Sequence, residues 1–284
     1  MYEARFGLKR RPFPPTPDSS LYYPSTPHEQ ALAPLLRSVD DDEGLMLLIG
    51  EPGTGKTLIG QVFLERLGEK VVNAFVPHGQ FANRLALLQA ILFDLSLPYD
   101  ENTEQLLRLR LTAFALKNAA EGKRFVIVVD EAHLLTPELL EELRLLGNLE
   151  AGRKAVQIVG LAQPRIQDTL KQPGLATWNQ RLGVRMFLPA LTLEDSLDYL
   201  QQHLRLAGAR PDDVIDEAAR EAIAQATRGV PRLLNQAAHQ SLLLAEAADL
   251  HRVDVECAME ALTMLGLEVE AEHAVTPVFH RAAA

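Results

Sequence analysis

Apolar and polar positions follow two different patterns along the chain, and the first extends from about Leu45 to Leu191. Here short, nearly continuous apolar runs alternate with longer segments in which apolar residues recur every three or four positions. The runs predict strands buried on both faces, and the longer segments predict helices. Such alternation is typical of an α/β fold in which helices cover both faces of a parallel sheet, giving three layers. The five predicted strands are residues 45–50, 71–76, 124–130, 156–162 and 184–189.

After Leu191 the strand pattern stops, and only helical periodicity remains. Thr192 lies three residues before Asp195, the spacing of a capping box that opens a helix. We therefore predict a small helical domain over residues 192–265, after a first domain over 45–191, and a loosely held tail over 266–284. The predicted helices of the second domain lie near residues 193–207, 214–227, 231–247 and 254–264.

The first 44 residues combine closely spaced prolines with aromatic residues, among them Phe6, Phe13, Tyr22 and Tyr23. Proline at this density prevents long helices, whereas the aromatic side chains favour packing on a folded domain. We expect residues 1–44 to pack on the domain formed by residues 45–191.

Composition narrows the classes of function. The 284 residues are 47% hydrophobic and carry a formal net charge of -10, which disfavours a broadly basic surface for DNA or anionic lipid. Cys257 is the single cysteine, so neither an intrachain disulfide nor a cysteine metal cluster can form. Neither a signal peptide nor an apolar run of about 18 residues occurs, so we expect a cytoplasmic location without a direct membrane span.

Residues 50–57, GEPGTGKT, match the phosphate-binding pattern G-x-x-x-x-G-K-[ST] and lie between a predicted strand and a predicted helix, as that pattern requires. The glycines let backbone amides wrap a polyphosphate, Lys56 supplies a positive charge, and Thr57 offers a hydroxyl to Mg²⁺. The predicted cofactors are ATP and Mg²⁺. The predicted nucleotide contacts are Gly50, Glu51, Pro52, Gly53, Thr54, Gly55, Lys56, Thr57 and Leu58.

A magnesium site beside a phosphate loop needs a carboxylate at the end of a neighbouring strand. The run FVIVVDE, residues 125–131, supplies two. We assign Asp130 to the metal and Glu131 to the attacking water, as general base. Taken alone, the pair would better fit acidic residues gathered at a helix N-terminus, and the phosphate loop upstream favours the metal. His133 is interpreted as a helix-approach residue or a partner-facing switch, and not as a ligand.

Four further polar positions are candidates for contacts with the nucleotide. Gln163 follows the fourth predicted strand, where its amide could contact the γ-phosphate or orient water, although a loop position accounts for it as well. Arg181 precedes the last strand and Arg185 lies within it; either could reach a nucleotide on an adjacent subunit, or be an ordinary surface arginine. Arg232 follows Pro231, which fixes a helix entry and presents the arginine rigidly towards a phosphate.

Taken in order, these motifs resemble the AAA+ family of P-loop ATPases, in which an αβα nucleotide domain with a parallel sheet carries a small helical lid. The resemblance implies that GEPGTGKT is Walker A, that Asp130 and Glu131 close Walker B, and that Gln163 is sensor 1. It also implies that Arg232 is sensor 2 and that Arg181 is the arginine finger, with Arg185 as the runner-up.

Two longer stretches narrow the resemblance. Both are similar to the cytoplasmic ATPase module of the general secretion pathway protein A family. They are FGLKRRPFPPTPD with LYYPSTPHEQALAPL, and EELRLLGNLEAGRKAVQIVGLAQPRI. This is the ExeA-like branch, which also resembles transposition ATPases of the TniB type. The branch usually has Gly and Glu where this chain has Ala162 and Arg165.

Two functions follow from the resemblance. The first is an ATP-hydrolysing switch that oligomerises, as a ring such as a hexamer, and remodels an unidentified protein partner of a secretion or pilus system. ATP would hold the lid through Arg232, and a neighbouring subunit would supply Arg181. The alternative is an ATP-dependent DNA-binding adaptor of the transposition type, supported by the cluster Lys9, Arg10 and Arg11, which a solvated basic turn accounts for as well.

Overall fold

The computed structural model describes residues 2–101 and 103–267, so most of the predicted C-terminal tail lies outside the described residues. The chain forms two compact units. We call the first the sheet unit; it comprises Pro14–Leu191 and Val230–Arg232. Among the described residues, the second unit, the helical unit, comprises residues 2–13, Thr192–Gly229 and residues 233–267.

Five parallel strands form the sheet, in the order β2-β3-β4-β1-β5. β1 is buried along its whole length between β4 and β5, which explains the unbroken apolar run LMLLI. The predicted α/β fold is confirmed, and each predicted strand is present to within two residues at its ends. The strands are β1 (Leu45–Gly50), β2 (Val71–Val76), β3 (Arg124–Val129), β4 (Gln157–Ala162) and β5 (Leu182–Leu188).

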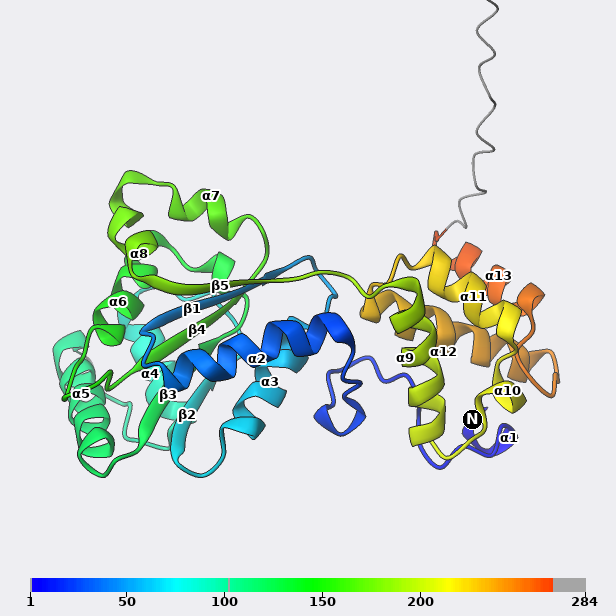
Figure 1. Ribbon diagram of the computed structural model, residues 1–284, viewed down its shortest axis with the longest axis horizontal. Coiled ribbons are helices and arrows are strands. Elements are labelled where there is room, and N and C mark those ends of the chain that lie inside the picture. The colour runs from blue at the N-terminus through cyan, green and yellow to red at the C-terminus, as the bar shows by residue number, and fades with distance from the viewer. Residues whose placement is uncertain (1, 102, 268–284) are drawn as a thin grey trace, which may run out of the picture. The chain divides into compact units, whose positions relative to one another are not determined.

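Helices cover both faces of the sheet (Figure 1). Side chains alternate along a strand, so β1 contributes Met46 and Leu48 to one core and Leu45, Leu47 and Ile49 to the other. The first core is closed by α2 (Thr26–Asp40) and α3 (Lys56–Leu67). The second is closed mainly by α4 (Arg84–Asp94), α5 (Glu104–Ala120), α6 (Pro137–Gly147), α7 (Ile166–Leu170) and α8 (Ala176–Gln180). The short 3-10 turns are η1 (Ser19–Leu21), η2 (Ala132–Leu134) and η3 (Pro173–Leu175).

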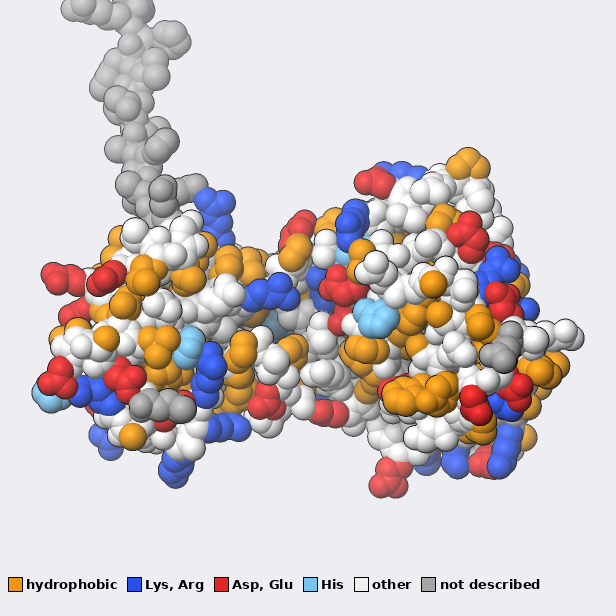
Figure 2. Space-filling model, turned by 180° about the vertical axis from the view of Figure 1, so that it is seen from behind, with side chains coloured by type: hydrophobic (Ala, Val, Ile, Leu, Met, Phe, Trp, Pro, Cys, Tyr) orange, Lys and Arg blue, Asp and Glu red, His pale blue; other side chains and the backbone are white. Residues whose placement is uncertain are grey.

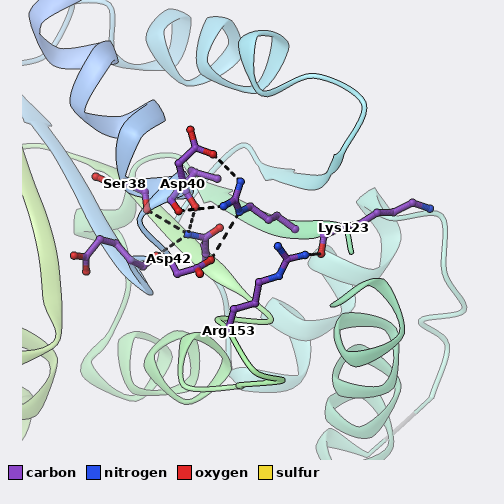
Figure 3. Close-up of polar contacts among 9 residues, drawn as sticks. Ser38, Asp40, Asp42, Lys123 and Arg153 are labelled. Carbon is purple, nitrogen blue, oxygen red and sulfur yellow. Dashed lines mark hydrogen bonds and ion pairs between the residues drawn. The ribbon is translucent and has the colours of Figure 1, made fainter. Parts of the chain in front are cut away.

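A polar corner at the amino ends of the strands fixes the turn between α2 and β1 (Figure 3). The fully buried amide of Gln157 donates to the carbonyl oxygens of Ser38, Val39 and Glu43, at 3.4, 3.1 and 3.0 Å. Arg124, at the start of β3, donates to a carboxylate oxygen of Asp40 at 2.7 Å. These bonds tie the entry of β1 to its neighbours, at the edge of the sheet opposite the phosphate loop.

The helical unit contains α1 (Tyr2–Arg5), α9 (Leu193–Leu206), α10 (Pro211–Val214), α11 (Glu217–Ala226), most of α12 (Pro231–Ala247) and α13 (Val255–Met264). The hydroxyl of Thr192 accepts the backbone N–H of Asp195 at 3.0 Å, the cap that the sequence predicted. The helix predicted near residues 214–227 is present as α11 but begins later, at Glu217, because Ile215 is extended and the side chain of Asp216 caps the helix.

The N-terminal segment is divided between the units. We expected all of residues 1–44 on the sheet domain, but the residues up to Phe13 pack within the helical unit. The hydroxyl of Tyr2 bonds to His239 Nδ1 at 3.0 Å, and the ring of Phe13 stacks on His203. Apolar aromatic residues indicate that a segment packs, and they do not specify which domain receives it.

Candidate phosphate-binding site

The candidate site lies at the carboxyl edge of the sheet, where β3, β4 and β1 end as neighbours. In open parallel sheets this edge is where ligands bind. β1 leads into the phosphate loop, β3 into Asp130 and Glu131, and β4 into Gln163. Three of the motifs predicted from the sequence are therefore brought together by strand order alone.

Three positions in the phosphate loop require glycine, two for their backbone conformation and one for lack of space. Gly53 and Gly55 have φ of 87° and 97°, values that side-chain-bearing residues rarely adopt. A Cβ at Gly50 would lie 2.8 Å from the carbonyl oxygen of Leu188. Gly55 is the N-cap of α3 and offers no side chain to it, so amides of the first helical turn remain available to a phosphate.

The ammonium group of Lys56 is held inside this loop. Nζ donates to the carbonyl oxygens of Gly50 and Glu51, both at 2.9 Å, and the residue is 5% exposed. Burial lowers the pKa of Lys56, while the nearby carboxylates of Glu131 and Asp130 act in the opposite direction. A cation bound by loop carbonyls is positioned to move a short distance onto phosphate oxygens.

Thr57 and Asp130 are in direct contact. Thr57 Oγ1 donates to Asp130 Oδ2 at 2.6 Å, and the backbone N–H of Glu131 donates to Oδ1 at 2.8 Å. Burial raises the pKa of Asp130, whereas the bond from Thr57 lowers it. The pair presents a hydroxyl and a carboxylate, both hard oxygen donors of the kind that Mg²⁺ takes.

Glu131 has an unusual backbone conformation, with φ of 50° and ψ of 35°, in the left-handed region. A Cβ on Gly79, in the loop after β2, would lie 2.3 Å from the carbonyl oxygen of Glu131, so a larger residue there would force the backbone to shift. The amide of Gln163 donates to Glu131 Oε2 at 3.5 Å. Strained residues held by their surroundings occur most often at functional sites.

The three arginine candidates are placed differently. The backbone N–H of Arg232 donates to the carbonyl of Gly53 at 3.2 Å, so the first turn of α12 adjoins the phosphate loop within the sheet unit. Arg181 donates to Asn148 Oδ1 and Arg185 to Asn179 Oδ1, each at 2.8 Å. Both of these side chains are exposed, as residues that reach another subunit must be.

Sequence reasoning missed two residues of the site, His28 and Gly79. His28 is buried on α2, and its Nε2 lies 3.1 Å from the carbonyl oxygen of Thr54 in the phosphate loop. A Cβ on Gly55 would lie 3.3 Å from the same nitrogen. Neither residue belongs to a spaced motif, and only the tertiary contact reveals either of them.

The basic cluster in the N-terminal segment is partly engaged in packing. Arg11 Nε donates to the carbonyl oxygen of Phe13 at 3.0 Å, and a Cβ on Gly208 would meet the stem of Lys9 at 3.0 Å. Figure 2 shows Lys and Arg side chains interspersed with Asp and Glu on the face it presents. These observations add no support to a DNA-binding role.

Comparison with known families agrees with this geometry. Residues 39–170 match the family model of the AAA domain. This match includes the phosphate loop, Asp130, Glu131 and Gln163, so the part of the chain that carries the candidate site is similar to an AAA domain.

The chain is related to general secretion pathway protein A of Aeromonas hydrophila. The two are 36% identical over 255 residues, which are 89% of this chain and 46% of that protein. The chain thus spans about half the length of this relative. None of the helices in residues 2–101 and 103–267 is long and apolar enough to cross a bilayer.

Solved structures share the fold at low sequence identity. The Aeropyrum pernix ORC2 protein, in ADPNP-ADP complexes, has a TM-score of 0.70 and 18% identity over 91% of this chain and 72% of that chain. Cdc6p from Pyrobaculum aerophilum has a TM-score of 0.69 and 19% identity, over 87% and 71%. The Thermotoga maritima RuvB Holliday junction branch migration motor has a TM-score of 0.59 and 18% identity, over 88% and 75%.

Proposed function

We propose that the protein binds and hydrolyses ATP with Mg²⁺ and acts as an oligomerising switch on a protein partner. The observation that carries this proposal is the bond between Thr57 and Asp130, 2.6 Å long, with Glu131 next in the chain. It joins the phosphate loop to the acidic strand end. A glycine-rich turn with a purely structural role would need neither the hydroxyl nor the carboxylate there.

Nucleotide binding would use residues 50–58. The open amides at the start of α3 and the positive charge of Lys56 both favour a polyphosphate. Arg232 would add a second positive charge from the first turn of α12, acting as a phosphate sensor. The ADPNP-ADP complexes of the similarly folded ORC2 protein support an adenine nucleotide as the ligand.

Thr57 and Asp130 fit a magnesium ion because both are oxygen donors and they already converge. Among the described residues no group of three His, Cys, Asp or Glu side chains could hold a metal, so phosphate oxygens and water would complete the shell. When bound, Mg²⁺ would neutralise charge on the β- and γ-phosphates. Asp130 would then bind the metal in its ionised form.

Hydrolysis would depend on Glu131 as general base for the attacking water, with Gln163 orienting the water or contacting the γ-phosphate. Arg181, or Arg185 as the runner-up, would reach the nucleotide of a neighbouring subunit. This trans contribution requires an oligomer such as a ring, in which hydrolysis would alter the contact between subunits and remodel the partner.

The relationship to general secretion pathway protein A supports a cytoplasmic role with a protein partner of a secretion or pilus system. The alternative remains an ATP-dependent DNA-binding adaptor. Filter binding against rising salt separates the two, because a DNA adaptor retains duplex with ATP at low salt and loses it steeply as salt rises.

The proposal is tested by ATPase assays and binding of a fluorescent ATP analogue. Lys56→Ala should lose binding, and Glu131→Gln should bind normally while turnover falls about 100-fold or more. Wild-type turnover in Glu131→Gln would refute the assignment. Glu138→Gln, an exposed substitution of the same type on α6, serves as the matched control.

A further inference from the structure

His133, which the sequence suggested as a helix-approach residue or a partner-facing switch, lies inside the site. It is carried by η2, directly after Walker B, and its side chain is fully buried. Its position excludes a partner-facing role in this conformation. The environment of its two ring nitrogens indicates a different role.

One ring nitrogen is bound to the end of β4. The backbone N–H of Gln163 donates to Nδ1 of His133 at 3.2 Å, so Nδ1 acts as an acceptor and carries no hydrogen. Burial, together with the positive charges of Arg165 and Lys56, lowers the pKa of His133 to about 4. The neutral ring at physiological pH therefore carries its proton on Nε2.

The other ring nitrogen faces Glu131. Nε2 is buried and, among the residues that the structure describes, has no partner in good hydrogen-bond geometry, yet Glu131 Oε2 lies 3.2 Å from it. A buried donor without an acceptor is unfavourable, and this favours a small rotation of the carboxylate towards the ring. The amide of Gln163 donates to the same oxygen, at 3.5 Å.

We propose that His133 is a positioning residue that holds Oε2 of Glu131 and leaves Oε1 as the oxygen that accepts a proton from water. The ring links two neighbouring strand ends, since it is bound to the backbone of Gln163 and faces the carboxylate of Glu131. A displacement of Gln163 is thereby transmitted to the general base. This inference rests on the proposed role of Glu131.

Three substitutions separate positioning from packing. His133→Phe keeps the ring volume and removes both nitrogens, and it should lower kcat about 10- to 100-fold with unchanged affinity for the ATP analogue. His133→Gln retains a donor near the position of Nε2 and should recover part of kcat. His251→Phe, at an exposed histidine of the helical unit, should leave kcat unchanged.

A spectroscopic measurement on the nucleotide-free protein needs no turnover. The histidine ring signals in nitrogen NMR should include a neutral ring with Nδ1 unprotonated and Nε2 protonated that is absent in His133→Gln, which assigns it to His133. In Glu131→Gln, the Nε2 resonance of the same ring should shift, because its acceptor has changed from a carboxylate to an amide.

The outcomes distinguish the inference from the proposed function. Wild-type kcat in His133→Phe, equal losses in His133→Phe and His133→Gln, or a ring protonated on Nδ1 would overturn the positioning role, even if Glu131→Gln is inactive. Should His133→Phe fail to fold, the Gln variant and the NMR signal still decide. An active Glu131→Gln would instead remove the proposed function itself.

Discussion

Thr57 Oγ1 lies 2.6 Å from Asp130 Oδ2, and this bond joins the first turn of α3 to the end of β3. The two residues follow β1 and β3, the strands that flank β4 in the sheet, and they are 73 positions apart in the chain. Both atoms are oxygens of the kind that Mg²⁺ takes, so under the proposed function the pair would hold the metal beside the phosphate loop.

The hydroxyl of Thr57 should therefore affect the Mg²⁺ concentration that ATPase activity requires. We expect Thr57→Ala to raise the Mg²⁺ concentration for half-maximal ATPase activity about tenfold, a change of about 1.4 kcal/mol. Thr57→Ser retains the hydroxyl and should resemble the wild type. Equal magnesium dependence in both variants would show that the hydroxyl plays no part, and activity measured across a magnesium titration provides the answer.

The close approach of Gly79 to Glu131 predicts a loss of both stability and activity in Gly79→Ala. An added Cβ would lie 2.3 Å from the carbonyl oxygen of Glu131, so the backbone of Glu131 or of the loop must shift. We expect the free energy of unfolding to fall by about 1–3 kcal/mol. Gly174→Ala is the matched control, because nothing lies within 4 Å of its Cβ.

Unfolding of the sheet unit can be followed through Trp178, the one tryptophan of the sequence. Its ring is buried, and Nε1 donates to the carbonyl oxygen of Leu140 at 3.0 Å. Urea titrations that give the same midpoint for Gly79→Ala and Gly174→Ala would show that the loop after β2 adapts without strain.

The buried His133 predicts acid sensitivity of the sheet unit. Its pKa is about 4 in the folded protein, against 6.5 for an unperturbed histidine, so the unfolded chain binds the proton more readily between these values. Stability is therefore lost as pH falls from 6.5 towards 4. Between pH 7 and pH 5 the wild type should lose about 2 kcal/mol more than His133→Gln. Parallel pH profiles for the two proteins would contradict this.

Catalysis in trans predicts complementation between two inactive variants. Arg181→Ala should lower turnover about 1000-fold, as loss of an arginine finger does. Mixing it with Glu131→Gln should restore activity, because an Arg181→Ala site receives Arg181 from a Glu131→Gln neighbour. The same mixture made with Arg185→Ala is the comparison, and the arginine whose variant is rescued is the finger. Additive, unrescued rates in both mixtures would argue against a shared site.

The fold was predictable because its strands are buried on both faces. Continuous apolar runs such as LMLLI in β1 and FVIVV in β3 are typical of strands in such a sheet, and the strand ends then bring GEPGTGKT, Asp130 and Gln163 to one edge. The motifs alone are sufficient to predict that these residues meet at one edge, since each motif follows a strand directly.

Contacts that depend on tertiary packing were not predictable. His28, Gly79 and His133 lie outside any spacing rule, and each reaches the site through the packing of a separate element. The division of the N-terminal segment at Phe13 had the same cause, as an apolar side chain can be buried equally well on either unit.

The buried amide of Gln157 bears on the alignment of the central strand. By holding three carbonyl oxygens of the preceding turn, it fixes the pairing in which Leu45 lies opposite Ile158. A slip of one residue would exchange the two faces of β1 and move Gly50 by about 3.3 Å along the strand. The side chain of Gln157, at the amino end of β4, therefore helps to set the position along β1 at which the phosphate loop begins.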